Sequence, residues 1–316
     1  MKYRRLGKTG LNVSVIGLGT WQLGGEWGKA FAQDEVDRMF ARAADLGINL
    51  VDTAECYGDH LSESLVGSAI RNGAGGRRED WVVATKFGHR FHGHMNRTDE
   101  RSAAHVRQQL EDSLRAMKTD YVDLYQFHSV RDAEFDDADL RRVLEDAVAS
   151  GKVRHLGNSV SSNLDPAHQV DGSSAANVGA IQIVYNRLDR RPEEAAFPSC
   201  RRQDLGVLAR VPLASGLLTG KYKPGRTSFA PGDFRAGQER ASIDAKLTEV
   251  ERIARDEVPP GVSMAEWALA WCLRHDAVTS VIPGCKSVEQ VESNARAAAL
   301  PMVRDDHPQA ARFPNV

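Results

Sequence analysis

Four residues with reactive side chains stand at or just after the ends of short β-type runs in this 316-residue chain. Asp52 and Lys86 each close such a run, and His128 directly follows a third. Tyr57 lies in the segment that comes after Asp52. If these runs are neighbouring parallel strands, their carboxyl ends meet at one rim and bring an acid, a phenol, an ammonium and an imidazole together.

This set suits proton transfer coupled to hydride transfer onto a carbonyl. A tyrosine with a pKa near its usual value of about 10 is a poor acid at neutral pH. We expect the Lys86 ammonium to favour the phenolate and so to lower the pKa of Tyr57. Asp52, paired with that lysine, would keep it charged inside the protein. His128 would donate a hydrogen bond to the oxyanion that develops during reduction.

The elements that must position these residues alternate along the chain. Short runs rich in branched and aromatic residues predict buried strands; they are Val15–Leu18, Ile48–Asp52, Trp81–Lys86, Tyr121–Phe127, His155–Ser159, Ala180–Val184, Gly206–Val211 and Val278–Ile282. Segments with apolar residues at helical spacing lie between them, among them Asp34–Leu46, Arg101–Met117 and Leu140–Ser150. This alternation predicts parallel strand–helix–strand units.

We therefore expect a single domain over residues 1–316, an α/β fold of the (β/α)8 TIM-barrel type with an N-terminal β-hairpin. The hairpin is predicted within Lys2–Val15. An open doubly wound sheet is the alternative, but the segment Gly17–Gln22 lacks the third glycine of its dinucleotide fingerprint. Residues 222–237 show no periodicity, which predicts a functional lid or a connector.

At these strand ends the sequence resembles the aldo-keto reductase superfamily, in particular its bacterial NADPH-dependent branch. The resemblance covers nearly the whole chain and is carried, in order, by GLGTW, VDTAxxYG, ATKFG, DLYQFH, IQIVYN, PLASGLLTGKY and a C-terminal VIPG stretch. It implies Tyr57 as the proton donor, Lys86 and Asp52 as its tuning pair, and His128 as the residue that orients the carbonyl.

The same resemblance implies a nicotinamide dinucleotide along the barrel rim, with NADP(H) preferred and NAD(H) as an alternative. The residues that it assigns to the cofactor are Gly19, Thr20, Trp21, Asp52, Ser159, Gln182, Arg210, Leu213, Ser215, Gly216, Leu218, Lys221, Gly284, Lys286, Gln290 and Asn294. Lys286 is the expected partner of a 2′-phosphate. The chain departs from the family pattern at Arg210, Val160 and Gln290, where many relatives carry an aromatic residue, an asparagine and an arginine.

The amino-acid composition argues against several kinds of binding partner. The 41 basic and 43 acidic residues are interspersed and leave a net charge of −2, so we expect neither a nucleic-acid surface nor a membrane-binding patch. The four cysteines show no metal-ligand spacing, and no metal is predicted. The basic N-terminus lacks the apolar run of a secretory signal, which favours a cytoplasmic protein.

Three functions remain open at this point. The first is a reductase of small-molecule carbonyl compounds: aldehydes, ketones or sugars. Residues that could wall its substrate pocket are Trp21, Trp27, Phe87 and His89, while Arg90, His92 and Arg97 would favour an acidic or polyhydroxylated substrate. The second is a cofactor-binding redox sensor or regulatory subunit with negligible turnover. The third is a metal-dependent hydrolase using Asp52 and His128, although no His-x-His pair closes a predicted strand. The oligomeric state stays open.

Overall fold

Eight parallel strands form one curled sheet in the computed structural model, which describes residues 1–161, 164–230 and 233–311. In sheet order they are β12 (Ser280–Val281), β11 (Gly206–Arg210), β10 (Val178–Val184), β9 (Val153–Ser159), β8 (Val122–His128), β5 (Val82–Phe87), β4 (Leu50–Asp52) and β3 (Leu18–Gly19). Parallel bridges from Ile16 to Val281 and from Gly19 to Gly284 join the two edges of the sheet. The predicted barrel is confirmed.

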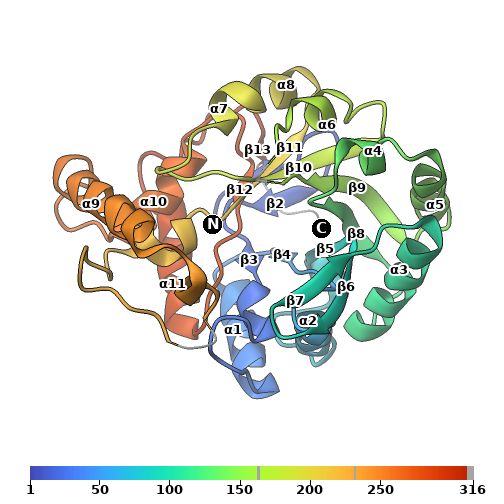
Figure 1. Cartoon of the computed structure of the whole chain (residues 1–316), viewed down its shortest axis with the longest axis horizontal. Helices are drawn as coiled ribbons and strands as arrows, with labels where there is room; N and C mark the ends of the chain where they lie inside the picture. The colour runs from blue at the N-terminus through green and yellow to red at the C-terminus, as the bar shows by residue number, and fades with distance from the viewer. Residues whose placement is uncertain (162–163, 231–232, 312–316) are drawn as a thin grey trace.

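A ring of helices covers the outside of the barrel (Figure 1). Those that connect or follow the strands are α1 (Gln33–Asp45), α2 (Leu61–Arg71), α3 (Ala103–Met117), α5 (Ala138–Ala149), α6 (Ala167–Asp171), α8 (Phe197–Arg202), α10 (Met264–Leu273) and α11 (Val288–Arg296). Shorter or additional ones are α4 (Asp132–Phe135), α7 (Pro192–Ala195) and α9 (Arg240–Asp256). Among the described residues, none of the helices combines the length and apolar character needed to cross a bilayer.

The predicted helices form because one face of each is apolar and its ends are satisfied. In α1, Val36, Met39, Phe40 and Ala43 are buried against the barrel. At its N-terminus the Glu35 carboxylate accepts a hydrogen bond from the backbone N–H of the preceding turn. This helix follows β3 and so leads the chain back to the start of β4, which ends in Asp52.

The predicted N-terminal hairpin is confirmed and closes the bottom of the barrel. Strands β1 (Tyr3–Arg5) and β2 (Asn12–Ser14) pair antiparallel. Apolar side chains of the hairpin pack against the inward-facing side chains of the strands; the cluster contains Leu6, Leu11, Val13, Leu50, Val82, Ala84, Leu124, Ala180, Leu208 and Ile282. A Cβ at Gly206 would lie 2.5 Å from the Leu6 side chain, so this close packing requires glycine. The functional rim is therefore the opposite, open end.

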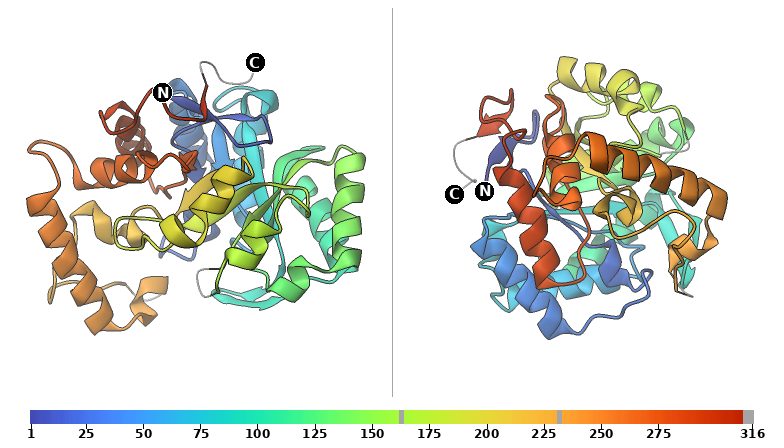
Figure 2. Two further views of the ribbon diagram at one scale, coloured as in Figure 1. Left: turned by 90° about the horizontal axis from the view of Figure 1, so that it is seen from above. Right: turned by 90° about the vertical axis from the view of Figure 1, so that its left-hand side faces the viewer.

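The end of the chain adds a third strand to this cap, β13 (Ala310–Ala311), beside β1. Figure 2 shows the last described residues, in red, beside the blue N-terminal strands on one side of the barrel. The adjoining His307 is 5% exposed, and its Nδ1 accepts a hydrogen bond from the Gln309 N–H at 3.1 Å. The nearby Arg4 is 2% exposed and donates to the carbonyls of Val278 and Leu273. A proton on His307 would add a charge to this buried cluster.

Stability should therefore fall on acidification. Burial and the Arg4 guanidinium lower the pKa of His307 from 6.5 to about 4. Since the folded pKa lies below the unfolded one, the stabilisation is full above about pH 6.5 and is lost as the pH falls towards 4, by about 2–3 kcal/mol. Denaturant unfolding at both ends of this range should show a smaller loss in His307→Gln than in the parent. An equal loss would exclude His307 as the source.

Candidate functional site

The predicted proton-transfer residues meet at the open rim of the barrel. Lys86, fully buried at the end of β5, donates from Nζ to Asp52 Oδ2 at 2.8 Å. The same ammonium donates to the Thr53 carbonyl at 2.7 Å and lies 3.0 Å from the Tyr57 hydroxyl. Strand register explains the meeting: Asp52 pairs with Ala84, so that Lys86, two residues further on, extends past it on the same face.

The second carboxylate oxygen of Asp52 is bound by amides from across the barrel. Gln182 Nε2 donates to Asp52 Oδ1 at 2.6 Å and Gln126 Nε2 at 3.1 Å. Ser159 Oγ in turn donates to Gln182 Oε1 at 3.3 Å. The carboxylate thus has a partner on each oxygen inside the barrel, which compensates its burial. Ser159 and Gln182, assigned from sequence to the nicotinamide carboxamide, bind Asp52 and one another in this structure.

Burial decides the proton affinity of this set. It raises the pKa of Tyr57, and the opposing attraction of the Lys86 ammonium does not cancel it. The expectation of a lowered Tyr57 pKa is therefore wrong for the protein alone, because removal of the phenolate from water outweighs the lysine. For Lys86, burial acts downwards, but Asp52 and Tyr57 outweigh it and hold the pKa above its ordinary value.

His128 faces Tyr57 across the same space. The two ring centroids lie 6.2 Å apart in an edge-on arrangement, and the His89 ring packs edge-on against His128 at 4.7 Å. Burial, followed by the charges of His89 and Lys86, lowers the pKa of His128 well below its usual value. The imidazole is therefore neutral at neutral pH and keeps one N–H with which it can donate a hydrogen bond.

A groove of about 700 Å³ opens beside these residues. Most of the positions predicted to bind cofactor line it: Gly19, Thr20, Trp21, Asp52, Gln182, Arg210, Leu213, Ser215, Gly216, Lys221, Gly284, Lys286, Gln290 and Asn294. Two predicted positions do not. Ser159 is buried behind Gln182, and Leu218 is fully buried with its N–H donated to the Leu213 carbonyl. Leu218 does not line the groove in this structure, because that turn closes on itself; its assignment to the cofactor stays a prediction.

Two of the positions that depart from the family pattern have identifiable partners. Arg210 Nη2 donates to the Val160 carbonyl at 3.1 Å, and its Nε is buried with no hydrogen-bond partner in the described part of the chain. Gln290 Oε1 accepts the backbone N–H of Lys286 at 2.8 Å. Lys286 Nζ itself donates to the Trp27 carbonyl at 2.7 Å and lies within the groove. It must leave that carbonyl to reach a phosphate.

Residues 222–237, whose positions 231–232 lie outside the described part, form what we call the strap. Asp233 makes an antiparallel bridge with Trp27, and Phe234 packs against Trp21 and Trp27 at centroid distances of 4.9 and 4.6 Å. Arg235 pairs with Asp233 and donates to the Ser215 carbonyl at 3.1 Å. The strap therefore crosses the groove, and the short helix η4 (Phe234–Gly237) gives it structure.

Sequence reasoning missed Arg235 as a groove residue. The signal that could have found it is the Asp-x-Arg pair next to Phe234 in a glycine- and proline-rich segment. The bridge between Asp233 and Trp27 could not be predicted, since more than two hundred positions separate the two residues.

The expected substrate wall is confirmed only in part. Trp21, Trp27 and His89 line the groove, but Phe87 does not: it is fully buried and packs against Tyr125 and Phe127. The chain after β5 forms an unpredicted hairpin of β6 (His89–Gly93) and β7 (Asn96–Asp99). This hairpin brings Arg97 into the groove, whereas Arg90 and His92 point to solvent-exposed partners.

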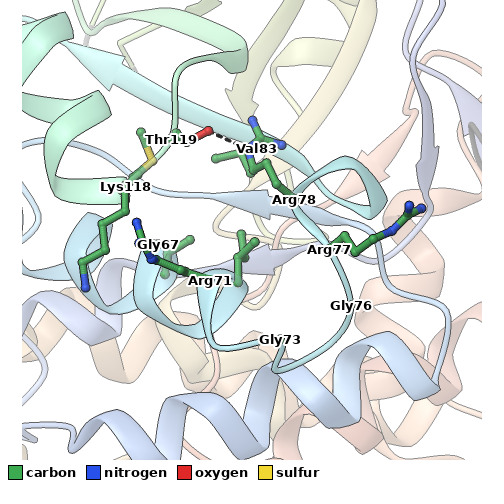
Figure 3. A pocket seen from close by; sticks show the side chains of 12 residues that line it. Gly67, Arg71, Gly73, Gly76, Arg77, Arg78, Val83, Lys118 and Thr119 are labelled. Carbon is green, nitrogen blue, oxygen red and sulfur yellow. Dashed lines mark hydrogen bonds between the residues drawn. The ribbon is translucent and has the colours of Figure 1, made fainter.

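A second, smaller cavity of about 300 Å³ lies at the opposite end of the barrel, by the start of β5 (Figure 3). Arg71, Arg77, Arg78 and Lys118 line it. Arg78 is already bound to Asp123, Arg77 to Asp80, and Lys118 to the Ser68 hydroxyl. None of the four candidate proton-transfer residues lines this cavity, so it is not the candidate active site.

Known proteins resemble this chain in sequence and in fold. The model of the Aldo/keto reductase family matches residues 15–313. The uncharacterized oxidoreductase YqkF of Bacillus subtilis is 33% identical over 299 residues, covering 94% of this chain and 91% of that protein. A probable voltage-gated potassium channel subunit beta of Oryza sativa subsp. japonica is also 33% identical, with the same coverage.

Among solved structures, the holo form of aldo-keto reductase AKR11C1 from Bacillus halodurans superposes with a TM-score of 0.78 at 31% identity. It covers 98% of this chain and 94% of its own. The resemblance noted from the strand-end motifs thus extends to the whole fold, and the chain belongs to the aldo/keto reductase family.

Proposed function

We propose that this oxidoreductase reduces small-molecule aldehydes, ketones or sugars with NADP(H). One observation carries the proposal: a single buried ammonium, Lys86 Nζ, binds both Asp52 and the Tyr57 hydroxyl, with the neutral His128 ring opposite. Two groups able to donate a hydrogen bond thereby face one space, as reduction of a carbonyl oxygen requires.

The groove suits a dinucleotide. Its volume lies within the range of small-molecule and cofactor sites. Lys221, Arg235 and Lys286 line it and supply positive charge for phosphates. Buried polar atoms that have no partner among the described residues also line it, namely Gln22 Oε1, Trp27 Nε1 and Arg210 Nε. When bound, the reduced nicotinamide supplies the hydride.

The side chains of the site polarise the carbonyl group and supply the proton. His128 donates a hydrogen bond to the carbonyl oxygen and so polarises it. Tyr57 donates its proton to the same oxygen as negative charge develops there. Lys86 then stabilises the phenolate that is left, and Asp52 keeps the lysine charged throughout. We place this activity in the cytoplasm, since all four cysteines are free and buried.

The test uses purified protein, NADPH and an activated aldehyde such as 4-nitrobenzaldehyde, with the nicotinamide absorbance as the readout. We expect consumption of NADPH that depends on aldehyde and persists with a chelator. Consumption that a chelator abolishes and that Tyr57→Phe leaves intact would contradict the proposal. Cofactor binding without turnover on a panel of carbonyls would favour the regulatory alternative, the role named for the Oryza sativa relative.

Cofactor preference should depend on Lys286. Its Nζ donates to the Trp27 carbonyl, a neutral acceptor that it can exchange for a 2′-phosphate. We expect Lys286→Ala to weaken NADPH binding about 10- to 100-fold, the value of a charge-assisted hydrogen bond, and NADH binding far less. Fluorescence titration with both dinucleotides measures this difference.

The matched control is Lys246→Ala, which changes an exposed lysine of α9 outside the groove. It should leave both affinities unchanged. Equal weakening of NADPH and NADH by Lys286→Ala would contradict a role at the 2′-phosphate.

A further inference from the structure

Four side chains of metal-ligating type converge beside the proton-transfer set. Glu55 and Cys56 follow β4, His89 begins β6, and His128 ends β8. One potential ligand atom from each lies within 4.8 Å of all the others. No local spacing in the sequence signals this cluster, because three separate strand ends contribute to it.

Two of the distances already suit a tetrahedral ion. Cys56 Sγ lies 3.7 Å from His128 Nδ1, and His89 Nδ1 lies 3.4 Å from Glu55 Oε1. In a tetrahedral zinc site with metal–ligand distances of about 2.0–2.3 Å, neighbouring ligand atoms are about 3.3–3.8 Å apart. Since all four ligand atoms lie within 4.8 Å of one another, the other pairs need to close by up to about 1–1.5 Å.

Two buried polar atoms of this cluster are available to bind a cation. Glu55 is only 3% exposed, and its Oε2 has no hydrogen-bond partner among the described residues; His89 Nδ1 is likewise buried without one. Leaving such a group unsatisfied costs about 1–3 kcal/mol. A cation bound between them would satisfy both.

The backbone around the cluster is held in place. Glu55 Oε1 accepts the His89 N–H at 3.0 Å, which links two of the three ligand-bearing segments. Gln109 of α3 binds the backbone on both sides of this point, at the Gly88 N–H and the His89 carbonyl. Hydrogen bonds of this kind orient the segments that carry the ligands.

We propose that Glu55, Cys56, His89 and His128 form a binding site for a divalent transition metal, with Zn²⁺ as the ion that fits. The thiolate and two imidazoles exclude Mg²⁺ and Ca²⁺, which prefer oxygen ligands. The carboxylate and the thiolate together neutralise the dication. Binding forms a Zn–S bond and breaks the S–H bond of Cys56, whose proton passes to the solvent; no electron is transferred.

The site shares His128 with the proposed reductase, so the two activities are coupled. Closing the ligands by about 1 Å moves His128 and the segment just before Tyr57, and misplacement of this size is sufficient to cost roughly 10²-fold in turnover. The coupling rests on the proposed function, whereas the binding of the metal does not. A direct binding measurement therefore separates the two.

Co²⁺ serves as the spectroscopic probe for the chelator-treated full-length protein. We expect one equivalent to bind with a thiolate-to-cobalt charge-transfer band and the d–d spectrum of a tetrahedral ion. Zn²⁺ should displace it, with release of about one proton per ion when Zn²⁺ binds the metal-free protein. The charge-transfer band should disappear in Cys56→Ser, and His89→Gln should lower affinity at least 10-fold.

Cys200→Ala and His155→Gln are the controls, because these residues lie outside the cluster. Both should bind Co²⁺ as the parent does. A thermal unfolding curve shows whether each variant is folded. If Cys56→Ser does not fold, the Co²⁺ affinity of His89→Gln tests the proposal. Absence of the charge-transfer band in the parent, or an unchanged spectrum and affinity in folded Cys56→Ser and His89→Gln, would overturn the proposal whatever the outcome of the reductase assay.

Discussion

Tyr57→Phe should lower the turnover of carbonyl reduction by roughly 10²- to 10⁴-fold, the contribution of a positioned general acid. The substitution removes one oxygen atom, which lies 3.0 Å from Lys86 Nζ, and keeps the ring that faces Trp21 and His128. Dinucleotide affinity should therefore change little. Steady-state kinetics with NADPH and 4-nitrobenzaldehyde, together with a binding titration, measure both quantities.

The pH profile gives this prediction a second readout. Burial raises the pKa of Tyr57 above 10.0, so its hydroxyl stays protonated through the neutral range. Because the protonated form is the acid, the turnover that depends on Tyr57 should be constant at neutral pH and fall only above about pH 10. Whatever activity remains in Tyr57→Phe should lack this fall.

Tyr125→Phe is the matched control. Tyr125 is also buried, but its hydroxyl has no hydrogen-bond partner among the described residues and its ring packs in the core against Phe87. It should turn over at nearly the parent rate. If Tyr57→Phe kept more than about a tenth of the parent turnover, another group would have to be the proton donor.

The architecture could be predicted from sequence because each element carries its own local signal. Every predicted strand is present, with ends displaced by a few residues. Strand β13 could not be predicted, since Ala310–Ala311 is too short for any periodicity and is a strand only through its pairing with β1. The strap is similar: its bridge between Asp233 and Trp27 depends on tertiary contact.

The positions of the candidate proton-transfer residues were also predictable, whereas their electrostatics were not. Strand ends placed Asp52, Lys86 and His128 at one rim, which the structure confirms. The pKa of Tyr57 depends on how burial compares with one nearby charge, and both act at once. Similarly, nothing in the spacing of Cys56 and His128 signals their 3.7 Å contact. Both the pKa of Tyr57 and the contact between Cys56 and His128 depend on how the barrel packs, which the sequence pattern does not specify.

Lys86→Met should destabilise the protein by about 3–5 kcal/mol, the cost of leaving one partner of a buried ion pair alone. Lys86 is fully buried, and the Asp52 carboxylate, which is 3% exposed, would keep the neutral amide donors of Gln126 and Gln182 but lose its ammonium. Carbonyl reduction should fall at least 10²-fold as well, because the ammonium that binds the Tyr57 hydroxyl would be lost. Denaturant unfolding and the NADPH assay measure the two losses.

The double variant Lys86→Met/Asp52→Asn separates charge pairing from catalysis. It removes the unpaired carboxylate, so most of the lost stability should return. Its turnover should stay as low as that of Lys86→Met, since Tyr57 still lacks its ammonium. Lys246→Met, an exposed change on α9, should alter stability by less than about 0.5 kcal/mol. Equal instability of the single and double variants would show that Lys86 contributes packing rather than charge, and recovery of turnover in the double variant would remove Lys86 from the proton-transfer set.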